Sequence, residues 1–205
     1  MKKINILDST LRDGAQSEGI SFSVSDKLHI IQALDDFGVS YIEAGNPGSN
    51  PKDIEFFNRA AEIKLKNAKL CAFGSTRRKN LAVEEDDNVL SLLKARTDVV
   101  VIFGKSWDLH IREILRTTEE NNLELVYDTV NFFKKKDKEL IFDAEHFFDG
   151  FKANRDCAVN VLKTADAAGA DSLCLCDTNG GCTPDEILRI TREIVGLFPG
   201  RQIGI

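Results

Sequence analysis

Residues 154–181 read NRDCAVNVLKTADAAGADSLCLCDTNGG and contain a helix, a strand and a polar strand end in that order. The stretch 154–168 is long and amphipathic, which is typical of a helix, and Gly169 is the residue type that ends helices. The apolar run 172–176 follows as a strand, and Asp177 begins the polar segment behind it. This order predicts one unit of an α/β fold.

The same alternation extends over the whole chain, and two helices have a residue placed to cap their N-termini. Ser25 precedes the helix 26–37, and Thr183 precedes the helix 184–197, which has a proline in its first turn. The pattern predicts helices at 26–37, 53–66, 88–95, 109–120, 154–168 and 184–197, and strands at 4–8, 39–44, 69–73, 98–103, 124–130, 138–144, 172–176 and 201–205. Such alternation indicates parallel strands joined by helical crossovers in a single domain.

Two architectures fit parallel strands with helical crossovers, an open doubly wound sheet and a closed eight-stranded barrel. No G-x-G-x-x-G motif follows the first strand, which disfavours a dinucleotide-binding sheet. We count about six strand-helix units and the start of a seventh strand at 201–205.

Composition excludes several functional classes. The chain has 205 residues, 42% of them hydrophobic and 29% charged, and its net charge of −6 argues against nucleic acid or an anionic membrane as a partner. The basic runs at 77–79 and 134–136 are typical of solvated loops or helix ends. No apolar run approaches the ~20 residues of a membrane span, and residues 4–7 are too few for a signal peptide. We expect a cytoplasmic protein whose first strand is buried.

The five cysteines do not form a disulfide framework, because their number is odd and their spacing irregular. Cys174 and Cys176 share one face of a strand. A thiolate metal site would need further ligands, and Cys182 is the cysteine nearby. The pattern therefore favours packing in the core.

Polar residues follow six of the predicted strands, where the active site of a parallel barrel lies. They are Asp8–Gln16 after the first strand; Glu43, Gly45 and Asn46 after the second; Gly74–Arg77 after the third; Gly104–Trp107 after the fourth; Asp143, Glu145 and His146 after the fifth; and Asp177–Asn179 after the sixth. Arg12 and Asp13 could form a surface ion pair, or a cation donor beside a hard metal ligand, and their spacing favours neither.

The segment Asp8-Ser9-Thr10-Leu11-Arg12-Asp13-Gly14 resembles the D-x-T-L-R-D-G signature of the DRE-TIM metallolyase superfamily. The resemblance implies a TIM (β/α)8 barrel, truncated here after about six units plus the start of strand seven. Residues 1–205 would form the N-terminal portion of the catalytic domain, with the barrel end and any regulatory domain outside them. Segments 41–53, 72–78, 103–108, 142–150 and 176–181 resemble the citramalate synthase branch.

The resemblance also implies roles for single residues. Asp13 would be the carboxylate ligand of a divalent metal (Mg, Mn or Zn), and Arg12 would polarise the oxo group of a substrate. Thr178 would hold a 2-oxo acid carboxylate, and Glu145 would position substrate or assist proton transfer. Gln16 would line the pocket. Weaker candidates are Glu43, Asp143 and His146.

The implied reaction is a Claisen-type condensation of acetyl-CoA with a small 2-oxo acid, catalysed by an acyltransferase of amino-acid biosynthesis that is a homodimer at full length. Pyruvate, giving citramalate for isoleucine synthesis, is favoured over 2-oxoisovalerate, giving 2-isopropylmalate for leucine synthesis. Alternatives are an acyl-CoA lyase and a non-catalytic scaffold. Pocket residues decide the acceptor, and small apolar differences discriminate only modestly.

The sequence departs from the superfamily in one respect. The H-x-H motif that supplies two further metal ligands on strand seven is absent from residues 1–205. A cation held by one carboxylate and water would bind weakly. The 205-residue chain alone is therefore expected to have little activity, and its open sheet edge is expected to promote self-association.

Overall fold

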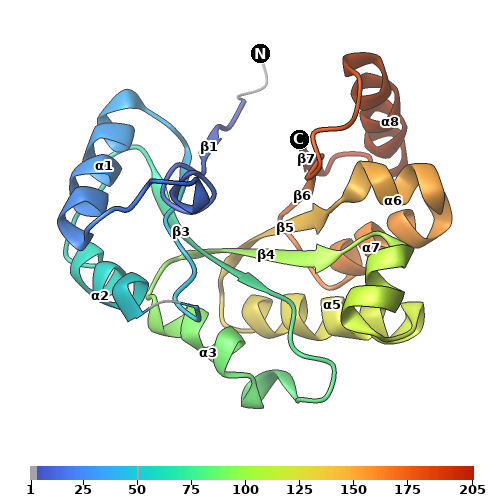
Figure 1. Cartoon of the computed structure of the whole chain (residues 1–205), viewed down its shortest axis with the longest axis horizontal. Coiled ribbons are helices and arrows are strands. Elements are labelled where there is room, and N and C mark those ends of the chain that lie inside the picture. The colour runs from blue at the N-terminus through green and yellow to red at the C-terminus, as the bar shows by residue number, and fades with distance from the viewer. Residues whose placement is uncertain (1–3, 50) are drawn as a thin grey trace. The chain divides into compact units, whose positions relative to one another are not determined.

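The computed structural model describes residues 4–49 and 51–205 (Figure 1). The start of the predicted domain at 1–3, and Asn50 of the segment 41–53, lie outside the described residues. Within these described residues, seven strands follow one another across the sheet in chain order. They are β1 (Leu7–Asp8), β2 (Tyr41–Glu43), β3 (Lys69–Ser75), β4 (Val99–Lys105), β5 (Glu139–Glu145), β6 (Ser172–Leu175) and β7 (Gln202–Gly204).

The strand order decides between the two architectures. A doubly wound sheet reverses its order at a switch point, whereas the strands of a (β/α)8 barrel stay in sequence. The observed order has no reversal, and β1–β2, β2–β3, β5–β6 and β6–β7 pair in parallel. The fold is therefore that of part of a (β/α)8 barrel. Within the described residues, every helix is too short or too polar to cross a membrane.

The chain divides into two compact units, Met1–Gly74 with Asp87–Val101 and Ser75–Asp86 with Ile102–Ile205. The helices of the first unit are a 3₁₀ turn η1 (Gly14–Gln16), α1 (Val24–Phe37), α2 (Pro51–Ala60) and α3 (Asp87–Lys94). In this unit α1 packs on α2.

The predicted helix 26–37 is confirmed, but Ser25 is not its cap. The Ser23 hydroxyl accepts from the Asp26 N–H, and the Asp26 carboxylate accepts from the Ser23 N–H in return, which is a capping box. The helix therefore begins two residues earlier. Gly38 ends it in the left-handed conformation, with φ of 93°.

The first strand is not buried as expected. Ile4 is 85% exposed and Ile6 is 56% exposed. Strand β1 spans only Leu7–Asp8, so Ile4 and Ile6 precede the strand.

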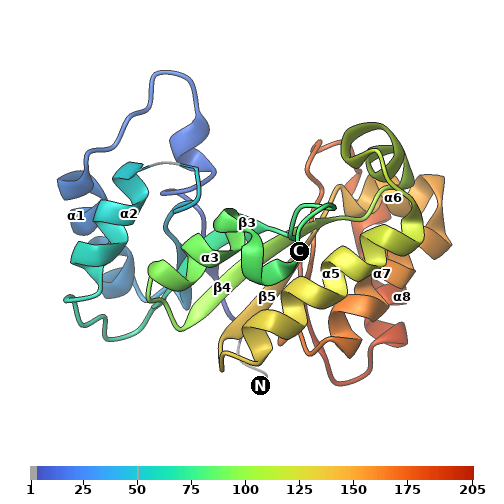
Figure 2. The same ribbon diagram turned by 90° about the horizontal axis from the view of Figure 1, so that it is seen from below.

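The second unit contains a 3₁₀ turn η2 (Val83–Glu85), α4 (Asp108–His110), a π-helical turn η3 (Ile111–Leu115), α5 (Glu119–Lys134), α6 (Phe147–Ala153), α7 (Arg155–Ala167) and α8 (Pro184–Leu197). Helix α7 packs on β5 and β6 and against α5 and α6. Figure 2 shows α5 and α7 side by side. Helices 154–168 and 184–197 were predicted correctly, the latter with its Thr183 cap.

Two predictions in this unit are wrong. The predicted helix 109–120 stops at Leu115, because Arg116 adopts a positive φ of 53° that breaks the turn. The predicted strand 124–130 lies inside α5, which Thr118 caps. The buried residues of α5 include Asn122, Leu125, Val126 and Thr129, whose spacing is helical. Helix α6 was not predicted at all.

Candidate functional site

Arg12 lies in the loop after β1, and three contacts hold its side chain. Its Nε donates to Oε2 of Glu43 at 2.5 Å and its Nη1 donates to Oδ1 of Asp13 at 2.9 Å. The guanidinium lies 4.1 Å from the ring centroid of Phe73. The Asp13 side chain is 66% exposed, whereas that of Glu43 is 1% exposed. The predicted residues Arg12, Asp13 and Glu43 are thus neighbours, and the guanidinium is fixed in orientation.

Glu43 is a buried carboxyl at the end of β2. Burial raises its pKa, the Arg12 guanidinium lowers it, and the result is a pKa above the ordinary value. Its Oε1 atom is buried and accepts no hydrogen bond from the described residues. Glu43 therefore orients Arg12 with one oxygen and leaves the other without a protein donor, which is a feature that functional sites tolerate.

A cavity of about 380 Å³ opens beside Arg12 in the first unit. Gln16, which ends η1, lines it together with Arg12, Phe73 and Asn46. The expectation that Gln16 faces a pocket is consistent with this placement, and its role in binding stays a prediction.

Sequence reasoning missed a buried ion pair that shapes the end of β2. Lys27 of α1 contacts Asp53 of α2 at 2.6 Å and donates to the Ala44 carbonyl at 2.9 Å. The other oxygen of Asp53 accepts from the Asn46 N–H at 2.9 Å. A Cβ on Gly45 would lie 2.5 Å from that carboxylate. The loop can take this path only with glycine there. The sequence signal that could have revealed this ion pair is Lys27, a lysine on the apolar side of a helix.

In the second unit, Glu145 at the end of β5 forms an ion pair with Lys105 at the end of β4, and both side chains are largely buried. The Ser106 hydroxyl donates to the Glu145 carbonyl at 2.7 Å, and Asn122 donates to the Lys105 carbonyl at 3.0 Å. Lys105 was noted after the fourth strand but not assigned a role. Pairing across adjacent strand ends is a tertiary property that spacing does not reveal.

Thr178 lies near Glu145, because its hydroxyl contacts the backbone of His146, the residue that follows Glu145 in the chain. The Thr178 hydroxyl accepts from the His146 N–H at 2.9 Å, so it can still donate its own proton. The His146 ring lies 3.3 Å from Asp149, and Asn179 donates to the same carboxylate at 2.8 Å. His146 adopts a positive φ of 54°. The bond from the His146 N–H orients the Thr178 hydroxyl.

An aromatic cluster adjoins this segment. The His110 ring centroid lies 4.5 Å from that of His146 and 4.7 Å from that of Trp107. Burial and the neighbouring His146 lower the pKa of His110. The imidazole is therefore neutral at physiological pH. Its Nδ1 is buried and has no hydrogen-bond partner among the described residues.

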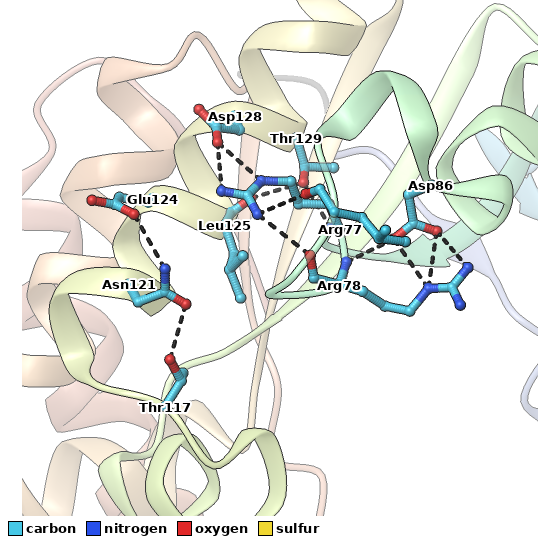
Figure 3. Close-up of polar contacts among 10 residues, drawn as sticks. Arg77, Arg78, Asp86, Thr117, Asn121, Glu124, Leu125, Asp128 and Thr129 are labelled. Atoms are coloured by element: carbon cyan, nitrogen blue, oxygen red, sulfur yellow. Dashed lines mark hydrogen bonds and ion pairs between the residues drawn. The ribbon is translucent and has the colours of Figure 1, made fainter.

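The arginines after the third strand serve the fold (Figure 3). Arg77 contacts Asp128 of α5 at 2.7 Å, and its N–H donates to the Thr129 hydroxyl at 2.9 Å. The Arg78 guanidinium contacts buried Asp86 at 3.2 Å. The Arg77 contacts thereby attach segment Ser75–Asp86 to α5, and the Arg78 contact joins the two ends of the segment. Both guanidinium groups therefore already have carboxylate partners within the protein.

The cysteines in and directly after the sixth strand are not core residues. Cys174 and Cys176 are partly exposed, contrary to the expected core packing. Among the described residues Cys182 does not belong to a ligand group with them, and its Sγ instead accepts from Nζ of Lys152 at 3.3 Å. Asp143 of β5 is their neighbour instead.

Replacing Gly150 in α6 by alanine should destabilise the protein by about 1–3 kcal/mol, the usual effect of overpacking. An added Cβ would lie 2.3 Å from the Ser106 carbonyl oxygen, and backbone atoms there cannot rotate away. The matched control is Gly196→Ala in α8, where a Cβ meets nothing within 4 Å. That change should stabilise by about 0.5–1 kcal/mol. Urea unfolding measures both, and equal stability of Gly150→Ala and wild type would contradict the packing argument.

Comparison with known proteins agrees with this fold. The HMGL-like family profile matches residues 3–204. The chain is 55% identical over 204 residues to an (R)-citramalate synthase of Aquifex aeolicus, covering 100% of this chain and 39% of that protein. It is 50% identical over 194 residues to the enzyme of that name from Sulfolobus acidocaldarius, covering 95% and 37%.

Among solved structures, the HMG-CoA lyase of Bacillus subtilis superposes with a TM-score of 0.80 at 20% identity, covering 99% of this chain and 67% of that one. Such a likeness concerns the fold. The family match is independent of it, and because it extends over nearly all of the 205 residues, the chain belongs to the HMGL-like family.

Proposed function

We propose that this chain is part of an acyltransferase that condenses acetyl-CoA with pyruvate to give (R)-citramalate. The observation that carries the proposal is the 55% identity over 204 residues with an (R)-citramalate synthase. The chain spans 39% and 37% of the lengths of the two relatives, so the proposal concerns the protein at full length. The complete enzyme would be a cytoplasmic homodimer of amino-acid biosynthesis.

Arg12 would stabilise the charge that develops on the oxo oxygen of pyruvate. A guanidinium has five N–H donors, and Glu43 and Asp13 accept from two of them. The other N–H groups remain for a substrate oxygen. Because Glu43 and Phe73 fix the guanidinium plane before substrate arrives, little reorganisation is needed as charge develops. Glu43 is in this view a positioning residue.

Thr178 and Glu145, which both belong to the second unit, would each act on one of the two substrates. The Thr178 hydroxyl, oriented by the His146 N–H, would donate to the carboxylate of pyruvate. The Glu145 carboxylate, paired with Lys105, would orient the acetyl group or accept a proton from its methyl carbon. Attack of the resulting enolate on the oxo carbon forms the new carbon–carbon bond, and thioester hydrolysis makes the reaction irreversible.

Membership of the HMGL-like family favours a metal-dependent enzyme. Asp13 is exposed and offers a hard carboxylate ligand. Within residues 4–49 and 51–205 it belongs to no group of three or more ligand side chains, so these residues fit a divalent cation only in part. A bound cation would polarise the oxo group, and Asp13 would be one of its ligands.

Thiol release from acetyl-CoA by the full-length protein tests the proposal. We expect kcat/KM for pyruvate to exceed that for 2-oxoisovalerate by at least about tenfold, since a pocket shaped for one methyl group rejects a branched one. The reverse preference would make the protein a 2-isopropylmalate synthase. Cleavage of a hydroxyacyl-CoA without condensation would make it a lyase, and absence of both reactions would favour the scaffold alternative.

A further inference from the structure

A second group of potential ligands, which does not include Asp13, lies on β5 and at the end of β6. Ligand atoms of Asp143, Cys174 and Cys176 all lie within 4.8 Å of one another. Among residues 4–49 and 51–205 this is the one set of three or more side chains found in such an arrangement. Neither cysteine is part of a disulfide and both are partly exposed, so an ion in solution can reach them.

Sheet geometry explains why these side chains converge. Cys174 and Cys176 are two residues apart and so point to the same face of the sheet. Leu173 and Leu175 alternate with them, point to the opposite face and are buried there. Asp143 stands opposite Cys174 in the parallel register of β5 and β6. The three ligands therefore come from two hydrogen-bonded strands, and their positions follow from the backbone.

The backbone around the group is held firmly. The Cys176 N–H donates to the Ala144 carbonyl at 3.3 Å, and the Cys176 carbonyl accepts from the Phe147 N–H at 3.0 Å. Strand β7 places Gly204 opposite Cys174. A Cβ on Gly204 would lie 3.4 Å from the Cys174 sulfur, so glycine leaves the space beside that sulfur open.

The distances suit a tetrahedral ion. Bonds of about 2.3 Å from an ion to two thiolates set the sulfurs about 3.8 Å apart. The ligand atoms lie within 4.8 Å of one another, so side-chain movements of at most about 1 Å, which rotation about χ1 supplies, would bring the sulfurs to that separation. Two thiolates and one carboxylate leave a fourth position for water.

We propose that Asp143, Cys174 and Cys176 form a binding site for a soft divalent cation such as Zn²⁺ or Cd²⁺. Thiolate ligands select soft ions, whereas Mg²⁺ takes oxygen ligands, so this site differs in chemistry from a hard-metal site at Asp13. Binding converts both thiols to thiolates and releases two protons per ion to the buffer. The ion lies on the strand face that also carries Glu145, two residues beyond Asp143.

Cadmium titration of the reduced, chelator-treated protein tests the site, with the sulfur-to-cadmium charge-transfer absorption as readout. Wild type should bind one ion with the absorption of two thiolates. Cys174→Ser and Cys176→Ser should each halve that absorption and raise Kd at least about tenfold. Asp143→Asn should raise Kd while keeping the absorption. The matched controls Cys182→Ser and Asp13→Asn should leave both quantities unchanged.

A second measurement needs no variant and so avoids misfolding. Cadmium should protect Cys174 and Cys176 of the wild-type protein from alkylation, as read by peptide mass mapping, and should leave Cys182 reactive. Unchanged binding in both Cys174→Ser and Cys176→Ser, equal loss in Cys182→Ser, or alkylation of all three thiols at saturating cadmium would overturn the proposal.

Discussion

Replacing Arg12 by alanine in the full-length protein should lower kcat for condensation by about 100- to 1,000-fold, the usual effect of removing an oxyanion donor. The guanidinium, fixed by Glu43, Asp13 and Phe73, is positioned to act as charge develops. We expect kcat and kcat/KM to fall together, because the interaction is made mainly in the transition state. Arg12→Lys should restore little, since an ammonium lacks the planar fork.

Two variants separate chemistry from folding. Arg12→Ala leaves the buried Glu43 carboxylate without its cation, which destabilises the fold. The double change Arg12→Ala with Glu43→Gln should recover stability and stay inactive. Arg155→Ala removes an exposed arginine paired with Glu193 and should retain activity. Near-normal turnover by Arg12→Ala would contradict the assigned role.

Replacing Asp35 by alanine should lower the free energy of unfolding by about 3 kcal/mol or more. The side chain of Asp35 is buried near the end of α1 and accepts from the N–H groups of Lys66, Asn67 and Ala68 at 2.8, 2.8 and 2.7 Å. Alanine would leave these donors without partners. Asp36→Ala is the matched control, because its carboxylate is exposed and lies 3.6 Å from Lys66. It should change stability by less than about 1 kcal/mol.

The effect of Asp35 depends on pH. Burial raises its pKa, but the backbone N–H donors of Lys66, Ala68 and Asn67 lower it more, and the pKa lies below its ordinary value. A carboxyl with a lowered folded-state pKa contributes its full stability above the unfolded value of about 3.9. The contribution is lost as pH falls through the folded-state pKa. Urea unfolding from pH 7 downward should show the gap between wild type and Asp35→Ala closing only in acid, and a constant gap would count against the charged hydrogen bonds.

Local signals in the sequence predicted most of the elements. Gly38 and Gly169 ended helices as expected, both with positive φ. Errors arose where two local patterns competed. Residues 124–130 are rich in β-branched and aromatic side chains, which favour strands, and only the longer period from Asn122 to Phe133 reveals a helix. Ser23 and Ser25 are both capping residues by type, and the reciprocal bond with Asp26 selected Ser23.

The sequence by itself determined the α/β alternation, the family signature around Arg12 and Asp13, and the polar residues at the strand ends, because these depend on neighbours along the chain. Only the tertiary structure decided which of these side chains contact one another. Lys105 meets Glu145, Lys27 meets Asp53, and Asp143 meets Cys174 only because parallel strands and helices bring distant segments together. Spacing along a chain carries no information about such contacts until the sheet register is known.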